Sequence, residues 1–154
     1  MSNEECDIVR FILRHRNNSE LVDFCATEPN GDPVVPYKRL MAVEILTSNL
    51  KSALRRCEEL LKYRGDRGLI ARLQAWEVPR FPISGTQLLE NGVAQGPQTG
   101  RVINELRKAW VYSDFQKLPD ELLKKDLPLI IQNLTEEKVR RSSLKRLKKE
   151  AKVK

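Results

Sequence analysis

The chain has 154 residues, of which 40% are hydrophobic and 32% are charged, and its formal net charge is +7. This composition is typical of a folded domain with a charged surface and excludes a disordered chain. No apolar run approaches the roughly 20 residues that are needed to span a bilayer, so we expect no membrane partner.

The cysteines and the histidine form no pattern typical of a metal site or a disulfide framework. Cys6, Cys25 and Cys57 are an odd number without ligand spacing, and we expect buried, unreactive thiols in a reducing compartment. His15, the one histidine, is expected on the surface at a helix end. The sequence therefore predicts no metal site and no Cys–His catalytic pair.

The positive charge is concentrated in a C-terminal extension. Residues 134–154 contain nine Lys or Arg and three Glu, whereas the other 133 residues contain 19 basic and 18 acidic side chains. This stretch is therefore predicted to attract polyanions, either as a binding surface or as a solvated run of charge. The first five residues are acidic, so they show no sign of a secretory or mitochondrial presequence.

The hydrophobic period is helical along the whole chain and predicts an all-α helical bundle. A first helix is expected from about residue 4 to residue 13, and a short second helix is expected to be capped by Ser19. Residues 28–33 contain Pro and Asn-Gly and predict a loop, after which Pro36 opens another helix.

The clearest amphipathic helix covers residues 50–61, and Gly65 is expected to end it. A further helix carries Leu69 to Trp76. Pro79 and Pro82 then bracket an extended link, because each proline disfavours helix at the residue before it. We place a first, body-like region at residues 1–78.

A second region, residues 79–133, contains shorter helices, and residues 134–154 form the basic extension, helical or disordered. Ser84 and Gln87 have the form of a capping box before a short helix. Gly96-Pro97 is expected to start a longer helix, and residues 118–121 are expected to start a short one. A third, marginal helix is expected to start at Thr135 in the extension.

The start of the longer helix is the strongest candidate for a binding site. Gly96-Pro97 is followed by small or polar residues, and we expect free amides at Gln98, Thr99 and Gly100, which suit a phosphate oxygen. Arg101 and Lys108 lie on the same outer sector of the helix. The alternative is that these glycines serve only to pack a tight helical hairpin.

The same segment carries a resemblance to a known family. The run Phe81-Pro82-Ile83-Ser84-Gly85, with Leu88, Gly92, Gly96-Pro97, Gly100 and Leu106-Arg107-Lys108-Ala109-Trp110, resembles the tail-domain signature of class II CCA-adding tRNA nucleotidyltransferases. Upstream, Cys57 to Gly65 and Leu73 to Trp76 resemble the body segment of the animal members. The similarity extends from the first helix to about Phe115 and excludes the basic extension.

The resemblance implies a function in holding tRNA. That family has a catalytic head, a nucleotide-selecting neck, a body and a tail, and the chain has neither the Asp-x-Asp pair of the head nor the visible template of the neck. We therefore expect no catalytic residue and no cofactor here, with Mg²⁺ and CTP or ATP belonging to head and neck regions outside this sequence. Whether the chain is part of a working enzyme stays open.

Body and tail are the parts that would grip the tRNA elbow and T-arm through the backbone, since double-stranded RNA hides its bases. The resemblance and the basic extension together predict RNA contacts at Arg80, Ser84, Gly96, Gln98, Thr99, Gly100, Arg101, Lys108, Arg140, Arg141, Lys145 and Arg146. We interpret Trp76, Phe81, Trp110 and Phe115 as packing residues rather than a base-stacking platform.

Two alternatives remain open. The catalytic half could be encoded upstream of this sequence, or the chain could be a helical protein-interaction or general polyanion-binding module derived from that family. Self-association is also left open. We expect an intracellular location, without a choice among cytoplasm, mitochondrion and nucleus.

Overall fold

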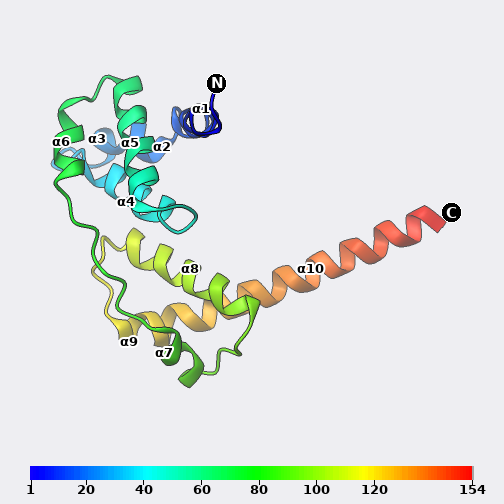
Figure 1. The fold of residues 1–154 in the computed structure, drawn as a ribbon. Coiled ribbons are helices and arrows are strands. Elements are labelled where there is room, and N and C mark those ends of the chain that lie inside the picture. Colours follow the sequence, from blue (N-terminus) through cyan, green and yellow to red (C-terminus); the bar gives the residue numbers. More distant parts are fainter. Residues whose placement is uncertain (154) are drawn as a thin grey trace. The chain divides into compact units, whose positions relative to one another are not determined.

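A computed structural model describes residues 1–153, and the part it describes is built from helices with no strand. This confirms the predicted all-α class. The chain divides into two compact units, Met1–Arg80 and a second unit that begins at Phe81 (Figure 1). None of the helices within residues 1–153 is long and apolar enough to cross a membrane.

The first helix, α1 (Asn3–His15), begins with a capping box that the sequence analysis missed. The Ser2 hydroxyl accepts the Glu5 amide at 3.2 Å, and the Glu5 carboxylate accepts the Ser2 amide at 2.6 Å. Both hydrogen bonds lower the pKa of Glu5, and the one from the Ser2 backbone amide has the larger effect. The two groups satisfy amides that have no partner inside the helix.

Two short helices follow, α2 (Ser19–Val22) and α3 (Phe24–Thr27). We had expected Ser19 to cap α2, but the cap is Asn18. The Asn18 side-chain oxygen accepts the Glu20 amide at 3.0 Å, and Asn18 is therefore the residue that caps α2.

The core of the first unit lies around α4 (Val35–Glu44), α5 (Leu50–Arg64) and α6 (Gly68–Gln74). Helix α5 packs against α1, α4 and α6. Four residues of its apolar stripe are fully buried: Ala53, Cys57, Leu60 and Leu61. Burial of such a stripe supplies most of the stability of an amphipathic helix.

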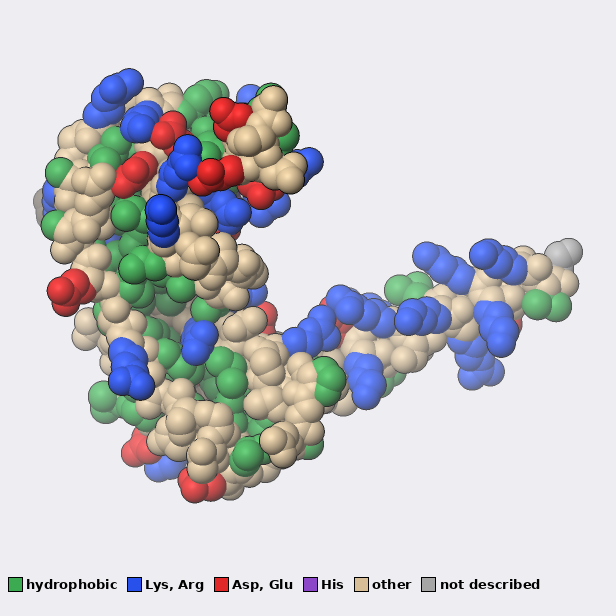
Figure 2. Space-filling view, viewed as in Figure 1, with side chains coloured by type: hydrophobic (Ala, Val, Ile, Leu, Met, Phe, Trp, Pro, Cys, Tyr) green, Lys and Arg blue, Asp and Glu red, His purple; other side chains and the backbone are tan. Residues whose placement is uncertain are grey.

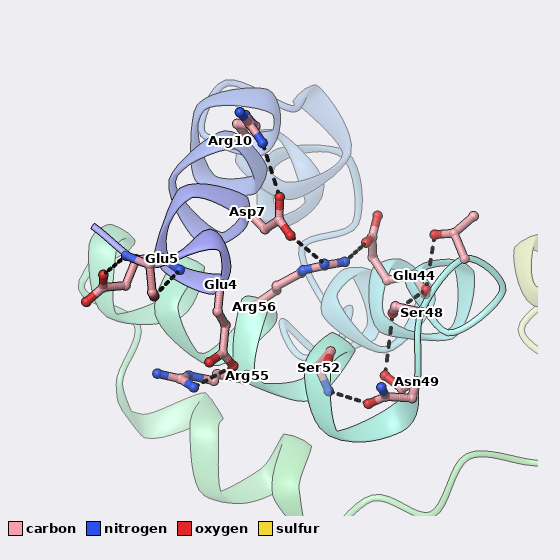
Figure 3. Close-up of polar contacts among 12 residues, drawn as sticks. Glu4, Glu5, Asp7, Arg10, Glu44, Ser48, Asn49, Ser52, Arg55 and Arg56 are labelled. Carbon is pink, nitrogen blue, oxygen red and sulfur yellow. Dashed lines mark hydrogen bonds and ion pairs between the residues drawn. The ribbon is translucent and has the colours of Figure 1, made fainter.

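Ion pairs at the edge of this core join three helices (Figure 3). Arg56 of α5 lies between Glu44 of α4, at 3.2 Å, and Asp7 of α1, at 4.0 Å. Arg55 contacts Glu4 at 2.5 Å. Each guanidinium therefore ties α5 to a helix distant in sequence.

The second unit contains α7 (Gly85–Glu90), α8 (Pro97–Tyr112), α9 (Pro119–Glu121), the π turn η1 (Leu122–Asp126) and α10 (Leu127–Val153). The predicted capping box of α7 is present, since Ser84 and Gln87 exchange hydrogen bonds. Helix α8 packs against α7, η1 and α10. Buried side chains between them include Leu88, Leu106, Leu122 and Leu127.

Aromatic side chains pack as predicted. Trp110 is 7% exposed and meets Phe81 and Phe115 edge to face, with ring centroids 5.5 and 4.9 Å apart. The Arg107 guanidinium lies 5.3 Å from the Phe81 ring. Trp76 packs against the core of the first unit, and it follows α6 rather than belonging to it.

The last helix is longer than the sequence analysis predicted. We expected it to begin at Thr135, but α10 begins at Leu127 and passes through residue 134, where we had placed a region boundary, without a break. Pro128 lies near the start of this helix, although proline usually interrupts a helix because it lacks an amide and clashes with the carbonyl four residues earlier. The wider η1 turn, in which the Leu127 N–H donates to the Leu122 carbonyl, precedes Pro128 and allows the helix to continue.

Two further expectations were right only in part. Cys25 is exposed and Cys6 is half-buried, whereas Cys57 is buried, which raises the pKa of its thiol. His15 lies at the end of α1 as expected, but it is half-buried because its ring packs against the Phe11 ring, with centroids 4.6 Å apart. An amphipathic helix buries one side of its last turn, and the lone histidine lies on that side.

Replacement of Gly65 should destabilise the first unit. Gly65 ends α5 with a φ of 80°, and an added methyl group would meet no other atom, so the cost is conformational. We expect Gly65→Ala to lower the free energy of unfolding by about 1 kcal/mol. Gly68→Ala, without a positive φ, is the control and should stay within about 0.5 kcal/mol of the parent. Equal effects in denaturant titrations would contradict this account.

His15 should make stability depend on pH. Burial, which outweighs the opposing carboxylate of Glu44, lowers the pKa of His15 in the folded chain, and Arg14 adds to this. The unfolded chain therefore binds the proton more readily, and stability should fall as pH drops below about 6.5. We expect His15→Gln to lose less stability than the parent between pH 7 and pH 5. Parallel pH profiles in denaturant titrations would show that His15 does not contribute.

Candidate nucleic-acid interface

The start of α8 is a tight, well-defined turn. Gly96 precedes the helix with a φ of 155°, a conformation that side chains disfavour, and Pro97 occupies the first turn. The Thr99 hydroxyl accepts the Gly96 amide at 3.2 Å and donates to the Ala94 carbonyl at 2.9 Å. Thr99 thereby fixes the approach of the chain to the helix.

Only part of the predicted set of free amides is available at this turn. The Thr99 amide donates to the Gly96 carbonyl at 3.0 Å, so our expectation for that amide was wrong. The Gln98 amide has no hydrogen-bond partner within residues 1–153, and the residue is exposed. Gln98 therefore presents a backbone donor to solvent at the positive end of the helix dipole.

Gly100 has no packing reason to be glycine. It lies inside α8 and is exposed, and a methyl group added there would meet no atom within 4 Å. Glycine inside a helix costs about 0.5–1 kcal/mol relative to alanine. The chain therefore keeps a small residue at a helix surface where its own fold does not require one.

A groove of about 330 Å³ joins the first turn of α8 to the middle of α10. Four of the predicted RNA-binding residues line it: Gln98, Arg101, Arg141 and Lys145. The remaining lining residues were not in our prediction: Leu134, Glu137, Lys138 and Ser142. Their spacing along α10 was visible in the sequence, but only the packing of α10 beside α8 assigns them to this groove.

The groove is strongly positive. Four cations line it, Arg101, Lys138, Arg141 and Lys145, against the one carboxylate of Glu137. Glu137 pairs with Arg141 one helical turn away. Cations that lie close together at a partly enclosed surface raise the local potential and attract anions. Figure 2 shows Lys and Arg side chains gathered along α10.

The other predicted residues do not line this groove. Lys108 is half-buried, and its ammonium lies 3.1 Å from the Glu105 carboxylate. The Ser84 hydroxyl takes part in the cap of α7, and Arg80 is an exposed residue of the first unit. Arg140 and Arg146 are exposed on α10, where Arg146 pairs with Glu150 at 3.2 Å.

A second, smaller groove of about 220 Å³ lies between α1 and α5 in the first unit. It contains two arginines and two carboxylates, which pair with one another: Arg55 with Glu4 and Arg56 with Asp7. This balanced groove provides no excess charge for an anion. Nor do residues 1–153 contain a group of three or more His, Cys, Asp or Glu that could hold a metal ion.

Comparison with known proteins relates this helical chain to the tRNA nucleotidyltransferases, although no family model matches it. The match covers 123 residues, or 80% of the chain, at 32% identity. The relatives are CCA tRNA nucleotidyltransferase 1, mitochondrial, from Mus musculus, and the proteins of the same name from Homo sapiens and Danio rerio, at the same identity and coverage.

The chain is therefore a relative of the animal CCA-adding enzymes and is similar to a C-terminal portion of them, which confirms the resemblance carried by the glycine motif. The matched segment spans 26% of the length of these relatives.

Gly100→Ala should stabilise the second unit. The alanine methyl group would point into open space, and alanine favours the helix more than glycine does. We expect the free energy of unfolding to rise by about 0.5–1 kcal/mol, measured by chemical denaturation. A loss of stability would show that the open space around Gly100 is not available in solution.

Proposed function

We propose that the chain binds tRNA through the sugar-phosphate backbone, at the groove between α8 and α10. The observation that supports the proposal most directly is the convergence of Gln98 with Arg101, Lys138, Arg141 and Lys145 around one groove. Helix N-termini and Arg or Lys side chains are the usual partners of phosphate oxygens.

Backbone recognition suits a protein that must accept many tRNAs. A-form RNA presents phosphates and 2′-hydroxyls and hides its base edges, so shape and charge can be read without sequence. The aromatic side chains Phe81 and Trp110 are engaged with each other, which agrees with backbone contact rather than base stacking. The elbow and T-arm of tRNA remain the part that we propose to be bound.

The chemistry would belong to a different part of the protein. In this proposal the chain positions the tRNA for 3′-terminal CCA addition, and Mg²⁺ with CTP or ATP bind to head and neck regions outside this sequence. The proposal includes an intracellular location, in agreement with the word mitochondrial in the names of the relatives.

A second candidate function is general polyanion binding, which the exposed basic part of α10 favours. Competition distinguishes the two. Labelled tRNA bound to the full chain should be displaced by unlabelled tRNA at lower concentration than by an unrelated RNA duplex of the same length. Equal displacement by both competitors would favour general polyanion binding.

Arg101→Gln should weaken tRNA binding and its dependence on salt. Loss of one phosphate contact should lower the slope of log affinity against log salt by about 0.7–1. Arg67→Gln, at another exposed arginine in the first unit, is the control and should leave the slope unchanged. Fluorescence anisotropy across a salt series measures both. An unchanged slope for Arg101→Gln would remove the groove from the interface.

Gly100→Ala should separate binding from stability. If a phosphate approaches the backbone of α8 at this position, an added methyl group will hold it away and weaken tRNA binding. The same variant is expected to be more stable than the parent, so weaker binding could not be attributed to unfolding. Unchanged tRNA affinity would mean that Gly100 has no part in binding.

A further inference from the structure

One face of α10 changes from apolar to cationic along its length. Steps of alternately four and three residues connect Leu127, Ile131 and Leu134, and the same alternation then connects five cations: Lys138, Arg141, Lys145, Lys148 and Lys152. Residues at these spacings share one helix face. Leu127 is buried and Leu134 lines the groove, so the face that packs into the unit continues as a row of charge.

The row extends well beyond the groove. From Lys138 to Lys152 it spans about 21 Å at the rise of an α-helix, with about one cation in every 5 Å. Residues 138–153 are all exposed, and this half of α10 extends away from α7, α8 and α9 (Figure 1). A strand of a DNA duplex presents a phosphate about every 3.4 Å along its axis, so a nucleic-acid strand offers negative charges at least as closely spaced as the cations of the row.

Most of these charges are not neutralised by the chain itself. Within residues 1–153, Arg141 pairs with Glu137, but Lys138, Lys145, Lys148 and Lys152 form no ion pair. Like charges at such spacing repel and disfavour the helix that carries them. A row of this kind gains most from an external partner with closely spaced negative charges.

We propose that this row and the groove at the first turn of α8 form one continuous surface that binds a single sugar-phosphate strand of a folded RNA. The proposal rests on the proposed function and extends it. It adds Lys148 and Lys152 to the groove residues already proposed, and it leaves out Arg140 and Arg146, which lie on other faces of α10.

An anionic membrane is the other partner that a basic helix can bind. A helix that lies in a membrane surface needs a broad apolar face below its cations. In residues 138–153 the apolar residues form only a narrow stripe, Leu144, Leu147 and Ala151, and two single valines on other faces, Val139 and Val153. The composition of this half therefore favours RNA.

Charge-matched double variants of the full chain test the proposal. Arg141→Gln with Lys145→Gln removes two cations from the groove part of the row, and Lys148→Gln with Lys152→Gln removes two from its outer part. Arg140→Gln with Arg146→Gln removes two from other faces and is the control. Glutamine favours helix about as well as lysine and arginine do, and circular dichroism verifies the fold of each variant.

Binding of a tRNA transcript is measured by anisotropy across a salt series. We expect each pair in the row to lower the salt slope by about 1.4–1.8, two lost phosphate contacts, and the control pair to change it by less than about 0.5. Equal losses for all three pairs would overturn the proposal, because net charge alone would then explain binding. Unchanged binding in both row variants would also overturn it.

Two results separate the possible failures. If the outer pair, Lys148→Gln with Lys152→Gln, binds normally while the groove pair and Arg101→Gln bind weakly, the continuous surface is wrong and the proposed function stands. If Arg101→Gln also binds normally, the proposed function fails as well. Vesicles that contain phosphatidylserine are the membrane probe: binding to them that is lost in the row variants, with unchanged tRNA binding, would overturn the proposal.

Discussion

The packing of α8 beside α10 is the constraint on which the candidate interface depends. Leu106 of α8, Leu122 of η1 and Leu127 of α10 are all buried, and α8 contacts both other elements. The cations of the groove repel one another, so they cannot bring these helices together. Burial of apolar surface does so, and it thereby holds Arg101 close to the basic face of α10.

Local signals were sufficient to predict much of the fold. The helical class, the capping box at Ser84, the end of α5 at Gly65 and the start of α8 at Gly96 each depend on a few neighbouring residues. The start of α8 and its flanking cations were also candidates for binding from the sequence, because a glycine-rich helix start is recognisable without knowledge of the packing. The motif that resembles the CCA-adding enzymes covers the same residues.

What could not be predicted depended on competing local signals or on tertiary contact. Both Asn18 and Ser19 can cap a helix, and the backbone selects Asn18. Pro128 is a helix breaker in most contexts, and only the wider η1 turn before it allows α10 to continue. The sequence did not show that one helix runs from Leu127 to Val153, so the cations of its second half were treated as one basic stretch. Their division into a groove face and other faces follows from the position of α10 beside α8.

The exposed half of α10 also has a thermodynamic consequence. An isolated helical segment of this length is marginal in water, and its row of unpaired lysines makes it less favourable still. A polyanion that neutralises the row would relieve this repulsion and stabilise the helical form of the segment at the same time. Helix formation in the segment and ligand occupancy would then be coupled equilibria, and the heat and entropy of association would include those of a coil-to-helix transition.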